Sequence, residues 1–543
     1  MKFCKLKFFF VIFVVAIIVC NVPNVELSKV NNVYAKSQPM RGVWVSTLTG
    51  MDFPNKPTND SGVLKAEIKQ IVKKCKEVGF NTVFLQVRPC ADAFYDSEVF
   101  PWSFYLTGEA GLAPTGRFDP LEYWVDICHE NSIDIHAWIN PYRITVNGDT
   151  EFNRLPKDHP AVLYPEYVVK YTDGNYYFNP GIPAVNDLVY EGAAEILQNY
   201  DVDGLHLDDY FYPGPEFDDE LTFQEYNFGG FSNKADWRRN NVDTLVKSLH
   251  NLSRISGAEF GVSPIGIWDN LKTNPLGSNT NGRSSYTELF ADSRGWVKKG
   301  YVDYIAPQIY WEFGHSLADY ETVANWWVNV CKGTDVKLYI GLADYKTIDV
   351  SSESPWYAGI QILKQMDFNT LNSGIDGEIH FRSKLVFEDS FLWNTIEDYY
   401  AYYEDDYIIT SPEVETSVNT ENTEKGDIRV FVSGREVFFD SAPIVEDDRI
   451  LVPMRAIFEA LGANVTWNQS TNSAVVKKDG TVIAFTPGSY IFEINSERYL
   501  FDVPAKVVNE RIVIPLRAVS EVMGYYVKWN SSANCVSISE NQY

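Results

Sequence analysis

Residues 203–213 have the sequence DGLHLDDYFYP, and this stretch is the strongest indication of the fold. It begins as a short apolar run and ends in carboxylates and aromatic residues. Side chains two residues apart in a strand share a face, so His206 and Asp208 are expected opposite Leu205 and Leu207. One aliphatic face and one polar face that ends in carboxylates are typical of a strand from a parallel barrel, where functional groups gather at the carboxyl ends.

Seven further runs of this kind occur along the first part of the chain. They are 42–46, 82–88, 133–140, 260–263, 304–310, 338–343 and 378–382. Most are followed by a helical pattern, such as 63–78, which Gly79 ends. Alternation of strands and helices implies parallel pairing, and eight units predict an α/β fold with a closed (β/α)8 TIM barrel. This part exceeds the roughly 250 residues of that fold, and the stretches 141–201 and 213–257 supply the excess.

The polar positions of these strands predict a functional cleft. Because the aliphatic faces must meet the outer helices, we expect the polar faces to point into the barrel. Aromatic rings pack on sugars, while amide and guanidinium groups bond hydroxyls. The predicted substrate-binding residues are Gln86, Arg88, Trp138, Asn140, Tyr142, Arg143, His206, Tyr210, Gln308, Tyr310, Trp311, His380 and Arg382. Simple packing is the alternative for each of them, and a single buried His such as His206 is more often part of a core.

Three carboxylates are candidate catalytic groups. Asp208 should face the lumen, and Asp209 follows it at the turn. Glycoside cleavage needs one group to protonate the leaving oxygen, and a second carboxylate or the substrate's own acetamide to meet the developing cation. Glu312 shares parity with Gln308 and is the candidate partner acid. The alternatives are a buried ion pair for Asp208, a loop cap for Asp209 and a solvent-facing loop position for Glu312.

Neither a metal nor another cofactor is expected. His206 and Asp208 lack a third ligand at suitable spacing. No CxxC pair occurs, and the cysteines beyond the N-terminal leader are odd in number, so they are expected to be mostly buried free thiols. They are Cys75, Cys90, Cys128, Cys331 and Cys535.

Composition excludes several classes of protein. The 543 residues are 45% hydrophobic and 22% charged, which excludes a disordered, collagen-like or coiled-coil chain. The net charge of −27 repels phosphate backbones, so we expect no nucleic-acid partner. Aromatic residues make up 15% of the chain. Many belong to the core, but exposed aromatics beside carboxylates are also what a sugar-binding cleft needs.

The N-terminus predicts a secretory signal peptide over residues 1–35. Lysines flank an uncharged apolar run, 8–20, which is too short to span a membrane. Val33-Tyr34-Ala35 offers a small-residue cleavage site. The alternatives are an uncleaved membrane anchor and, less favoured, a lipoprotein attached through Cys20. In each case the body of the protein lies outside the cytoplasm, either secreted or associated with the cell wall.

The chain divides at an acidic stretch. Residues 404–427 contain almost no bulky apolar side chains, so they predict a linker between a domain at 36–403 and a domain at 428–543. In the second domain RILVPMRA at 449 recurs as RIVIPLRA at 511, EALG at 459 as EVMG at 521, and VTWN at 465 as VKWN at 527. The constant offset of 62 residues (511 − 449) predicts a small α+β domain made of two copies of a strand, a helix (454–461 or 516–523) and a hairpin.

Two family resemblances follow from these motifs. The first rests on Gly42-Val-Trp-Val, Phe84-Leu-Gln-Val-Arg88, Ala137-Trp-Ile-Asn140-Pro-Tyr-Arg143, residues 203–213, Gly261-Val-Ser-Pro264 and Asp303-Tyr-Ile-Ala-Pro-Gln-Ile-Tyr-Trp311. In these motifs and their order, residues 41–403 resemble the bacterial glycosyl hydrolase-like family ten. The repeats resemble the copper amine oxidase N-terminal-like domain, but they contain no His, so a metal site is not expected there.

The resemblance implies an exported (β/α)8 glycosidase that acts on peptidoglycan glycan strands from which the stem peptides have been removed. The family's fourth-strand motif falls on His206, Asp208 and Asp209. The repeat domain is expected to bind or position the protein at the cell envelope. Two other functions stay open: a wall-glycan-binding protein without activity, and a glycosidase for another extracellular polysaccharide. A metal-dependent deacetylase is a more distant alternative.

Overall fold

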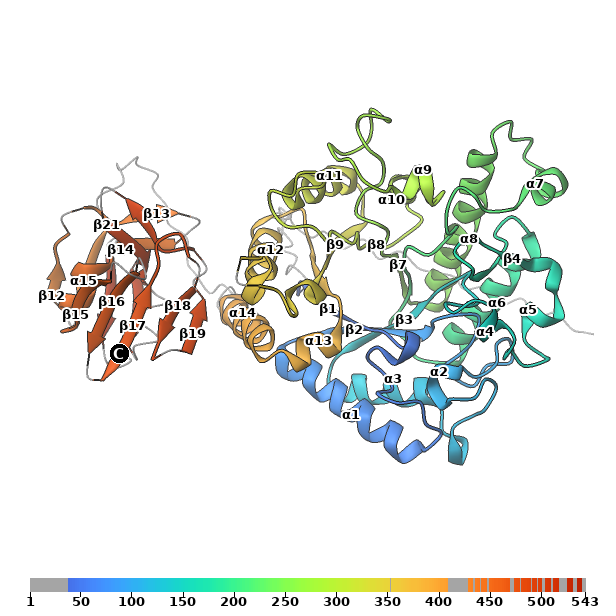
Figure 1. The fold of residues 1–543 in the computed structure, drawn as a ribbon, viewed down its shortest axis with the longest axis horizontal. Helices are drawn as coiled ribbons and strands as arrows, with labels where there is room; N and C mark the ends of the chain where they lie inside the picture. Colours follow the sequence, from blue (N-terminus) through green and yellow to red (C-terminus); the bar gives the residue numbers. More distant parts are fainter. Residues whose placement is uncertain are drawn as a thin grey trace, which may run out of the picture. The chain divides into compact units, whose positions relative to one another are not determined.

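The computed structural model describes residues 38–408, apart from 352, and residues 428–539, apart from 433–434, 440, 447–448, 469–472, 479, 490, 496, 501–502, 509–510, 517–524 and 531–534. The predicted signal peptide and residues 409–427 of the predicted linker lie outside this range. Figure 1 shows a large domain of strands and helices and a smaller β-rich domain.

Eight parallel strands close into a barrel in the order β1-β10-β9-β8-β7-β6-β3-β2, so the predicted (β/α)8 fold is confirmed. They are β1 Met40–Val45, β2 Thr82–Arg88, β3 Asp134–Ile139, β6 Gly204–Leu207, β7 Glu259–Val262, β8 Tyr304–Ile305, β9 Lys337–Leu342 and β10 Gly377–His380. Strand β8 is shorter than the predicted run, because Pro307 lacks the N–H that a ladder needs. Gln308 nevertheless keeps single bridges to Ile265 and Gly341.

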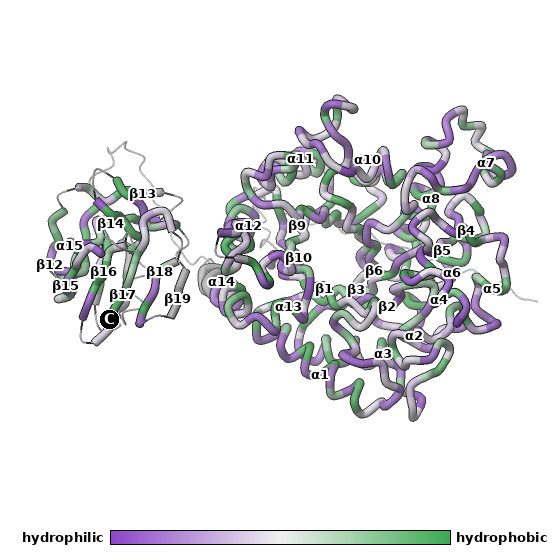
Figure 2. Tube along the Cα trace, in the orientation of Figure 1, coloured by the Kyte–Doolittle hydropathy of each residue, from purple (hydrophilic) through white to green (hydrophobic). Residues whose placement is uncertain are grey.

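Helices surround the barrel. The longer ones are α1 Ser61–Val78, α3 Pro120–Glu130, α6 Pro183–Asn199, α8 Lys234–Ser256, α10 Ser293–Lys299, α11 Tyr320–Cys331, α12 Ile360–Leu371, α13 Ser383–Glu388 and α14 Ser390–Ile408. Helix α1 begins where the Asp60 carboxylate accepts the N–H groups of Gly62 and Val63, and it ends at Gly79 with φ 96°. Hydrophilic and hydrophobic residues alternate along it (Figure 2), and its apolar stripe is buried.

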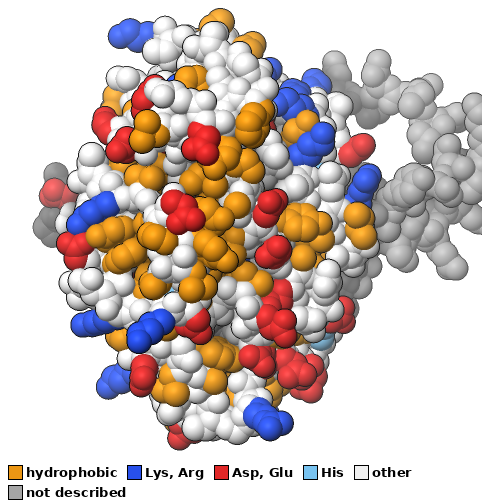
Figure 3. All heavy atoms as spheres, turned by 90° about the vertical axis from the view of Figure 1, so that its right-hand side faces the viewer, with side chains coloured by type: hydrophobic (Ala, Val, Ile, Leu, Met, Phe, Trp, Pro, Cys, Tyr) orange, Lys and Arg blue, Asp and Glu red, His pale blue; other side chains and the backbone are white. Residues whose placement is uncertain are grey.

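Short elements fill the loops that follow the strands. They are α2 Phe104–Thr107, α4 Asp149–Phe152, α5 Pro160–Leu163, α7 Glu220–Tyr226, α9 Ser285–Glu288, the hairpin β4 Val168–Lys170 with β5 Tyr176–Phe178, and the 3-10 turns η1 Leu48–Gly50, η2 Thr115–Arg117, η3 Pro165–Tyr167, η4 Asp344–Thr347 and η5 Tyr357–Gly359. The extra chain lies after β3 and β6, as predicted from the length. Figure 3 shows hydrophobic side chains among carboxylates on the face that carries these loops; exposed examples are Leu163, Tyr164, Leu221 and Phe228.

The barrel lumen is filled largely by apolar side chains. One buried cluster contains Trp44, Phe84, Trp138, Tyr304, Ala306, Tyr339 and Ile379. Two glycines make room for these large groups: a Cβ at Gly261 would overlap the Tyr304 ring, and one at Gly42 would lie 2.8 Å from Phe84. Above this packed layer the strand ends carry the polar groups of the site.

The second domain contains β11 Arg429–Val432, β12 Arg435–Val437, β13 Ile444–Glu446, β14 Arg449–Pro453, α15 Met454–Ala460, β15 Asn464–Asn468, β16 Ser473–Lys478, β17 Thr481–Phe485, β18 Ile491–Ile494, β19 Glu497–Leu500, β20 Lys506–Val508, β21 Arg511–Pro515, β22 Tyr526–Asn530 and β23 Cys535–Ser539. The starts of β11–β16 recur at β18–β23 after 62 residues, for example 429 to 491 and 464 to 526. Strands β14 and β21 pair antiparallel, with Val452 opposite its repeat counterpart Ile514. The second predicted helix falls mostly on residues outside the described range.

The boundary between the domains differs slightly from the prediction. Helix α14 continues to Ile408, so the first residues of the predicted linker are helical. Within the described ranges, no helix is both long and apolar enough to cross a membrane.

Candidate active site

Two adjacent aspartates stand at the carboxyl end of β6. Asp208 is 4% exposed, and its neighbour Asp209 is partly exposed. Asp208 Oδ2 accepts a hydrogen bond from Asn140 Nδ2 at 2.5 Å, and its Oδ1 accepts one from the Tyr210 N–H at 3.1 Å. Asp209 Oδ1 accepts one from Gln308 Nε2 at 2.9 Å. The two candidate carboxylates therefore lie together, and Asp209 is the more exposed of the two.

The electrostatics of this pair suit proton transfer. Burial and, next, the Asp209 carboxylate raise the pKa of Asp208 to about 7, against the opposing effect of Arg143. Burial raises the pKa of Asp209 as well, although the Gln308 hydrogen bond lowers it in part. Because adjacent carboxyls titrate as a pair, the upward shift of both pKa values favours retention of one proton by the pair.

The rim of the cleft carries polar and aromatic side chains from several loops. Gln308 Nε2 also donates to the Ser263 carbonyl at 2.8 Å, which fixes its amide beside Asp209. The Arg143 guanidinium lies 4.7 Å from the centre of the Tyr210 ring, and it donates twice to the Pro89 carbonyl. Arg143 and Gln308 thus lie at the aspartate pair.

Aromatic rings follow β8 and β10 on the same side. The Tyr310 ring stacks on Phe381 at 6.1 Å and meets Tyr345 edge-on at 5.9 Å. Burial raises the pKa of Tyr310, and the negative charges of Asp209 and Asp208 raise it further. This ring therefore lies near the pair. Trp311 packs against the backbone of Gly266. Tyr310 and Trp311 are partly exposed and suited to contact a sugar.

Glu312 is the least supported of the three candidate acids. Its Oε2 accepts a hydrogen bond from Trp356 Nε1 at 3.2 Å, and its charge acts on Lys346. Lys346 itself donates to the Tyr310 carbonyl at 2.6 Å. Among the described residues, these contacts tie Glu312 to the loop after β9 rather than to the aspartates.

Arg88 does not line the cleft, contrary to the prediction. A bulge between Gln86 and Arg88 shifts the register of β2 against β3, so Arg88 pairs with outward-facing Ile139. Its guanidinium lies 3.8 Å from the centre of the Phe100 ring and beside Gly192 of α6. The strict alternation that placed Arg88 in the lumen fails at this bulge.

Three more predicted binding residues belong to the core. His206 is fully buried, and its ring nitrogens meet Tyr304 Oη at 3.0 Å and Ser263 Oγ at 3.0 Å. Trp138 is part of the apolar lumen cluster. Tyr142 is fully buried and donates to Asn186 Oδ1 of α6 at 2.8 Å. The polar groups of His206 and Tyr142 are thus bonded within the protein, whereas the buried Trp138 Nε1 has no hydrogen-bond partner among the described residues.

His380 was assigned to the wrong face of β10, and Arg382 lies beyond the end of this strand. Ile379 fills the lumen, so His380 faces outward, where Asp344 Oδ1 lies 2.9 Å from Nδ1 and Tyr400 Oη 3.1 Å from Nε2. Burial lowers the pKa of His380, but the Asp344 carboxylate more than offsets this, and the net shift is upward. Arg382 pairs with buried Asp52 at 2.5 Å.

Two residues near the pair were missed from the sequence. The positive charge of Arg283, from the loop after β7, acts on Asp209 and Tyr210. Tyr345 follows β9 and is 41% exposed beside Tyr310. The available signal was that both residues follow the end of a strand. The sequence of a long loop does not show which of its residues turn back toward the aspartate pair.

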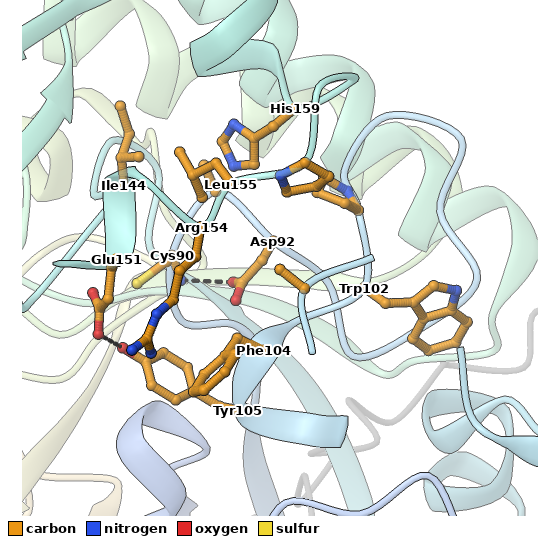
Figure 4. A pocket seen from close by; sticks show the side chains of 14 residues that line it. Cys90, Asp92, Trp102, Phe104, Tyr105, Ile144, Glu151, Arg154, Leu155 and His159 are labelled. Atoms are coloured by element: carbon orange, nitrogen blue, oxygen red, sulfur yellow. Dashed lines mark hydrogen bonds between the residues drawn. The ribbon is translucent and has the colours of Figure 1, made fainter. Parts of the chain in front are cut away.

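A second hollow lies between the loops after β2 and β3 (Figure 4). Its volume is about 40 Å³, which is room for one or two water molecules and too little for a sugar ring. Tyr105 Oη donates to Glu151 at 2.6 Å, and Asp92 accepts the Cys90 N–H at 3.0 Å. Its walls are mostly apolar, so it is a packing gap between loops.

In the described part of the chain the cysteines are free, and the possible metal ligands are not grouped. All five cysteines there are free, and four of them are buried, as predicted. Among these residues no group of three or more His, Cys, Asp or Glu side chains is arranged to hold a metal ion.

The fold and the site together define a TIM-barrel protein with a carboxylate pair at the end of the fourth barrel strand. Residues 39–358 match the model of the family described as "Glycosyl hydrolase-like 10", and residues 431–538 match "Copper amine oxidase N-terminal domain". The chain belongs to the glycosyl hydrolase-like 10 family, and both predicted resemblances are confirmed.

Similar proteins carry the same description. "Glycosyl hydrolase YngK" of Bacillus subtilis (strain 168) is 40% identical over 352 residues, which cover 64% of this chain and 68% of that protein. "Glycosyl hydrolase DigH" of Escherichia coli (strain K12) is 40% identical over 368 residues, covering 64% and 83%. A solved structure, the PgaB (BpsB) glycoside hydrolase domain of Bordetella bronchiseptica, aligns with a TM-score of 0.45 at 12% identity over 66% of this chain and 98% of that one.

Proposed function

We propose that the protein is an exported glycoside hydrolase in which Asp208 and Asp209 perform the acid–base chemistry. The observation that carries this proposal is the adjacent carboxyl pair at the end of β6, in which Asp208 is buried against hydrogen-bond donors and Asp209 is partly exposed beside Gln308. Burial raises the pKa of both carboxyls. One carboxyl can then protonate the leaving oxygen while the other stays negative and favours the developing cation. Family membership supports the same class of reaction.

The substrate that we propose is peptide-free peptidoglycan glycan. Its sugars carry 2-acetamido groups, and an acetamide can act as the nucleophile when a neighbouring carboxylate orients it. Adjacent aspartates with no other carboxylate contacting them in the described structure suit this route. The partly exposed Tyr310 and Trp311 offer stacking surfaces for sugar rings.

The location is also part of the proposal. The charged and apolar pattern of residues 1–35 supports export, and the C-terminal domain is proposed to hold the enzyme at the cell envelope. Deleting residues 428–543 should reduce sedimentation of the protein with purified cell walls while leaving hydrolysis of soluble glycan unchanged. Equal sedimentation of both forms would contradict the targeting role.

Hydrolysis is tested with the full mature chain. Incubation with peptide-free glycan should give new reducing ends, detected by mass spectrometry, and the fragment masses identify the bond that is cut. Intact peptidoglycan and an acetamide-free glucan serve as comparison substrates. Cleavage of the glucan without cleavage of the peptide-free glycan would contradict the proposed substrate. Retained binding without fragments on any glycan would favour a wall-binding protein.

The rate of hydrolysis should depend on pH through the aspartate pair. Asp208 has a raised pKa of about 7, so the pair carries its proton below that pH and loses it above. We therefore expect kcat/KM to fall as the pH rises through about 7. Replacing Asp209 with Asn removes the partly exposed carboxyl of the pair and should abolish this limb in the residual activity. A profile that stays flat through neutral pH would contradict proton donation by the pair.

A further inference from the structure

A chain of side-chain amides joins the end of β1 to Asp208. Gln86 Oε1 accepts three hydrogen bonds, from Ser46 Oγ at 2.9 Å and from the N–H groups of Thr47 and Leu48 at 3.0 Å each. Two of these donors are backbone amides, which can only donate. The side-chain oxygen of Gln86 must therefore face these donors. An NH2 group in the same position would point at two N–H groups and could not form a hydrogen bond with them.

This orientation passes to the next residue. With Oε1 turned toward β1, Gln86 Nε2 donates to Asn140 Oδ1 at 2.7 Å. Asn140 must then present its own NH2 group to Asp208 Oδ2. Gln86 is 1% exposed and Asn140 is fully buried, so neither is placed to bind substrate, contrary to the sequence prediction.

The chain of amides leaves both oxygens of Asp208 facing donors. Oδ2 meets the Asn140 NH2 group, and Oδ1 meets the Tyr210 N–H. Donors directed at both oxygens favour the ionised carboxylate. Asp209 receives a hydrogen bond from Gln308 at Oδ1 and is partly exposed. Burial alone would favour a proton on Asp208, but with N–H donors at both of its oxygens a proton there would have no acceptor among these partners, so the geometry favours the proton on Asp209.

We propose that Gln86 is a positioning residue: acting through Asn140, it keeps Asp208 an ionised acceptor and places the proton of the pair on Asp209. The catalytic meaning of this assignment rests on the proposed hydrolase function. Asp209 becomes the acid that protonates the leaving oxygen. Asp208 becomes the negative charge that favours the cation or orients the acetamide.

Other charged groups also act on the pair and are kept constant in the test. Arg143 lies on the β3 side, Arg283 comes from the loop after β7, and the Tyr210 and Tyr310 hydroxyls flank the carboxyls. Substitutions at position 86 change none of them. Gln86→Met is the main variant because it is similar in length and adds no charge.

The test measures the titration of the pair directly. Infrared difference spectra of the full chain follow the protonated carboxyl that is absent from an Asp208→Asn, Asp209→Asn double variant, so no turnover is needed. Gln86→Met should raise the midpoint by about half a unit to one unit, because Asp208 can then also take the proton. Ser46→Ala should leave it unchanged, because the two backbone donors still orient Gln86.

The Asn140→Ala background separates the amide chain from other effects. There the midpoint is already raised, and adding Gln86→Met should shift it little further, since the two residues act in series. An unchanged midpoint in Gln86→Met, or the same shift with and without Asn140, would overturn the proposal. These results stand even if no glycan is cleaved, so failure of the hydrolase proposal remains distinguishable.

Gln86→Glu provides a second test if the Met variant does not fold. A carboxylate at position 86 satisfies the three donors, but it cannot donate to Asn140. The Asn140 amide should turn around and present its oxygen to Asp208, which then requires a proton. The midpoint should rise further than in Asn140→Ala, and an unchanged or lower midpoint would contradict the proposed role of Gln86.

Discussion

Replacing Asp209 with Asn is expected to lower kcat on peptide-free glycan by about 10²–10⁴-fold, the usual contribution of a general acid. Asp209 is the partly exposed member of the pair and is held by Gln308 Nε2 at 2.9 Å. An Asn side chain keeps the size of the group but has no acidic proton to give. The loss is measured by release of reducing ends under substrate saturation.

The leaving group shows whether Asp209 acts as the acid. An aryl glycoside with an acidic phenol leaves without protonation, so Asp209→Asn should regain much of its rate on such a substrate. Asp208→Asn should stay impaired on both substrates, because its charge serves the other side of the reaction. Equal losses for Asp209→Asn on both substrates would remove Asp209 from the acid role.

Two controls bracket this result. Burial also raises the pKa of Asp92, to about 6, but Asp92 lies in the small gap between the loops after β2 and β3. Asp92→Asn should therefore keep kcat within about twofold, which would show that a raised pKa from burial is not by itself sufficient for a role in catalysis. Glu312→Gln tests the third candidate acid. Its contact with Trp356 predicts a smaller loss than at Asp209, and a loss of the same size would restore Glu312 as the catalytic partner.

The strands could be predicted because buried parallel strands have a simple signature. The predicted run 82–88 coincides with β2, and the strand predicted at the start of residues 203–213 corresponds to β6. Aliphatic residues between turn signals were sufficient there. The aspartate pair could also be found, because a strand that ends in adjacent carboxylates is a local pattern.

Which side of a strand each side chain points toward could not be predicted with the same success. The rule that polar faces point inward failed at β10, where Ile379 fills the lumen beside Gly42 and His380 finds Asp344 and Tyr400 outside. The rule assumed that the outer helices offer only apolar surface. The orientation of Gln86 depends on backbone N–H groups forty residues away along the chain, which no local pattern contains.

Asp219→Ala should lower the free energy of unfolding of the barrel by about 3–5 kcal/mol. Asp219 is fully buried, and its two oxygens accept from Arg238 Nε at 2.8 Å and Nη2 at 2.6 Å. Arg238 also donates to the carbonyls of Pro215 and Phe217. This guanidinium thus ties the loop after β6 to helix α8, and it cannot deprotonate when its partner is removed.

The measurement is denaturant unfolding of the full chain followed by tryptophan fluorescence, with Glu77→Ala as the control. Glu77 pairs with Lys73 at 3.4 Å, but both side chains are well exposed, so this change should cost less than about 1 kcal/mol. Asp219→Asn keeps a hydrogen-bond acceptor without the charge and should fall between the two. If Asp219→Ala costs no more than Glu77→Ala, then water reaches Arg238 and the loop that follows the catalytic strand is not anchored by this pair.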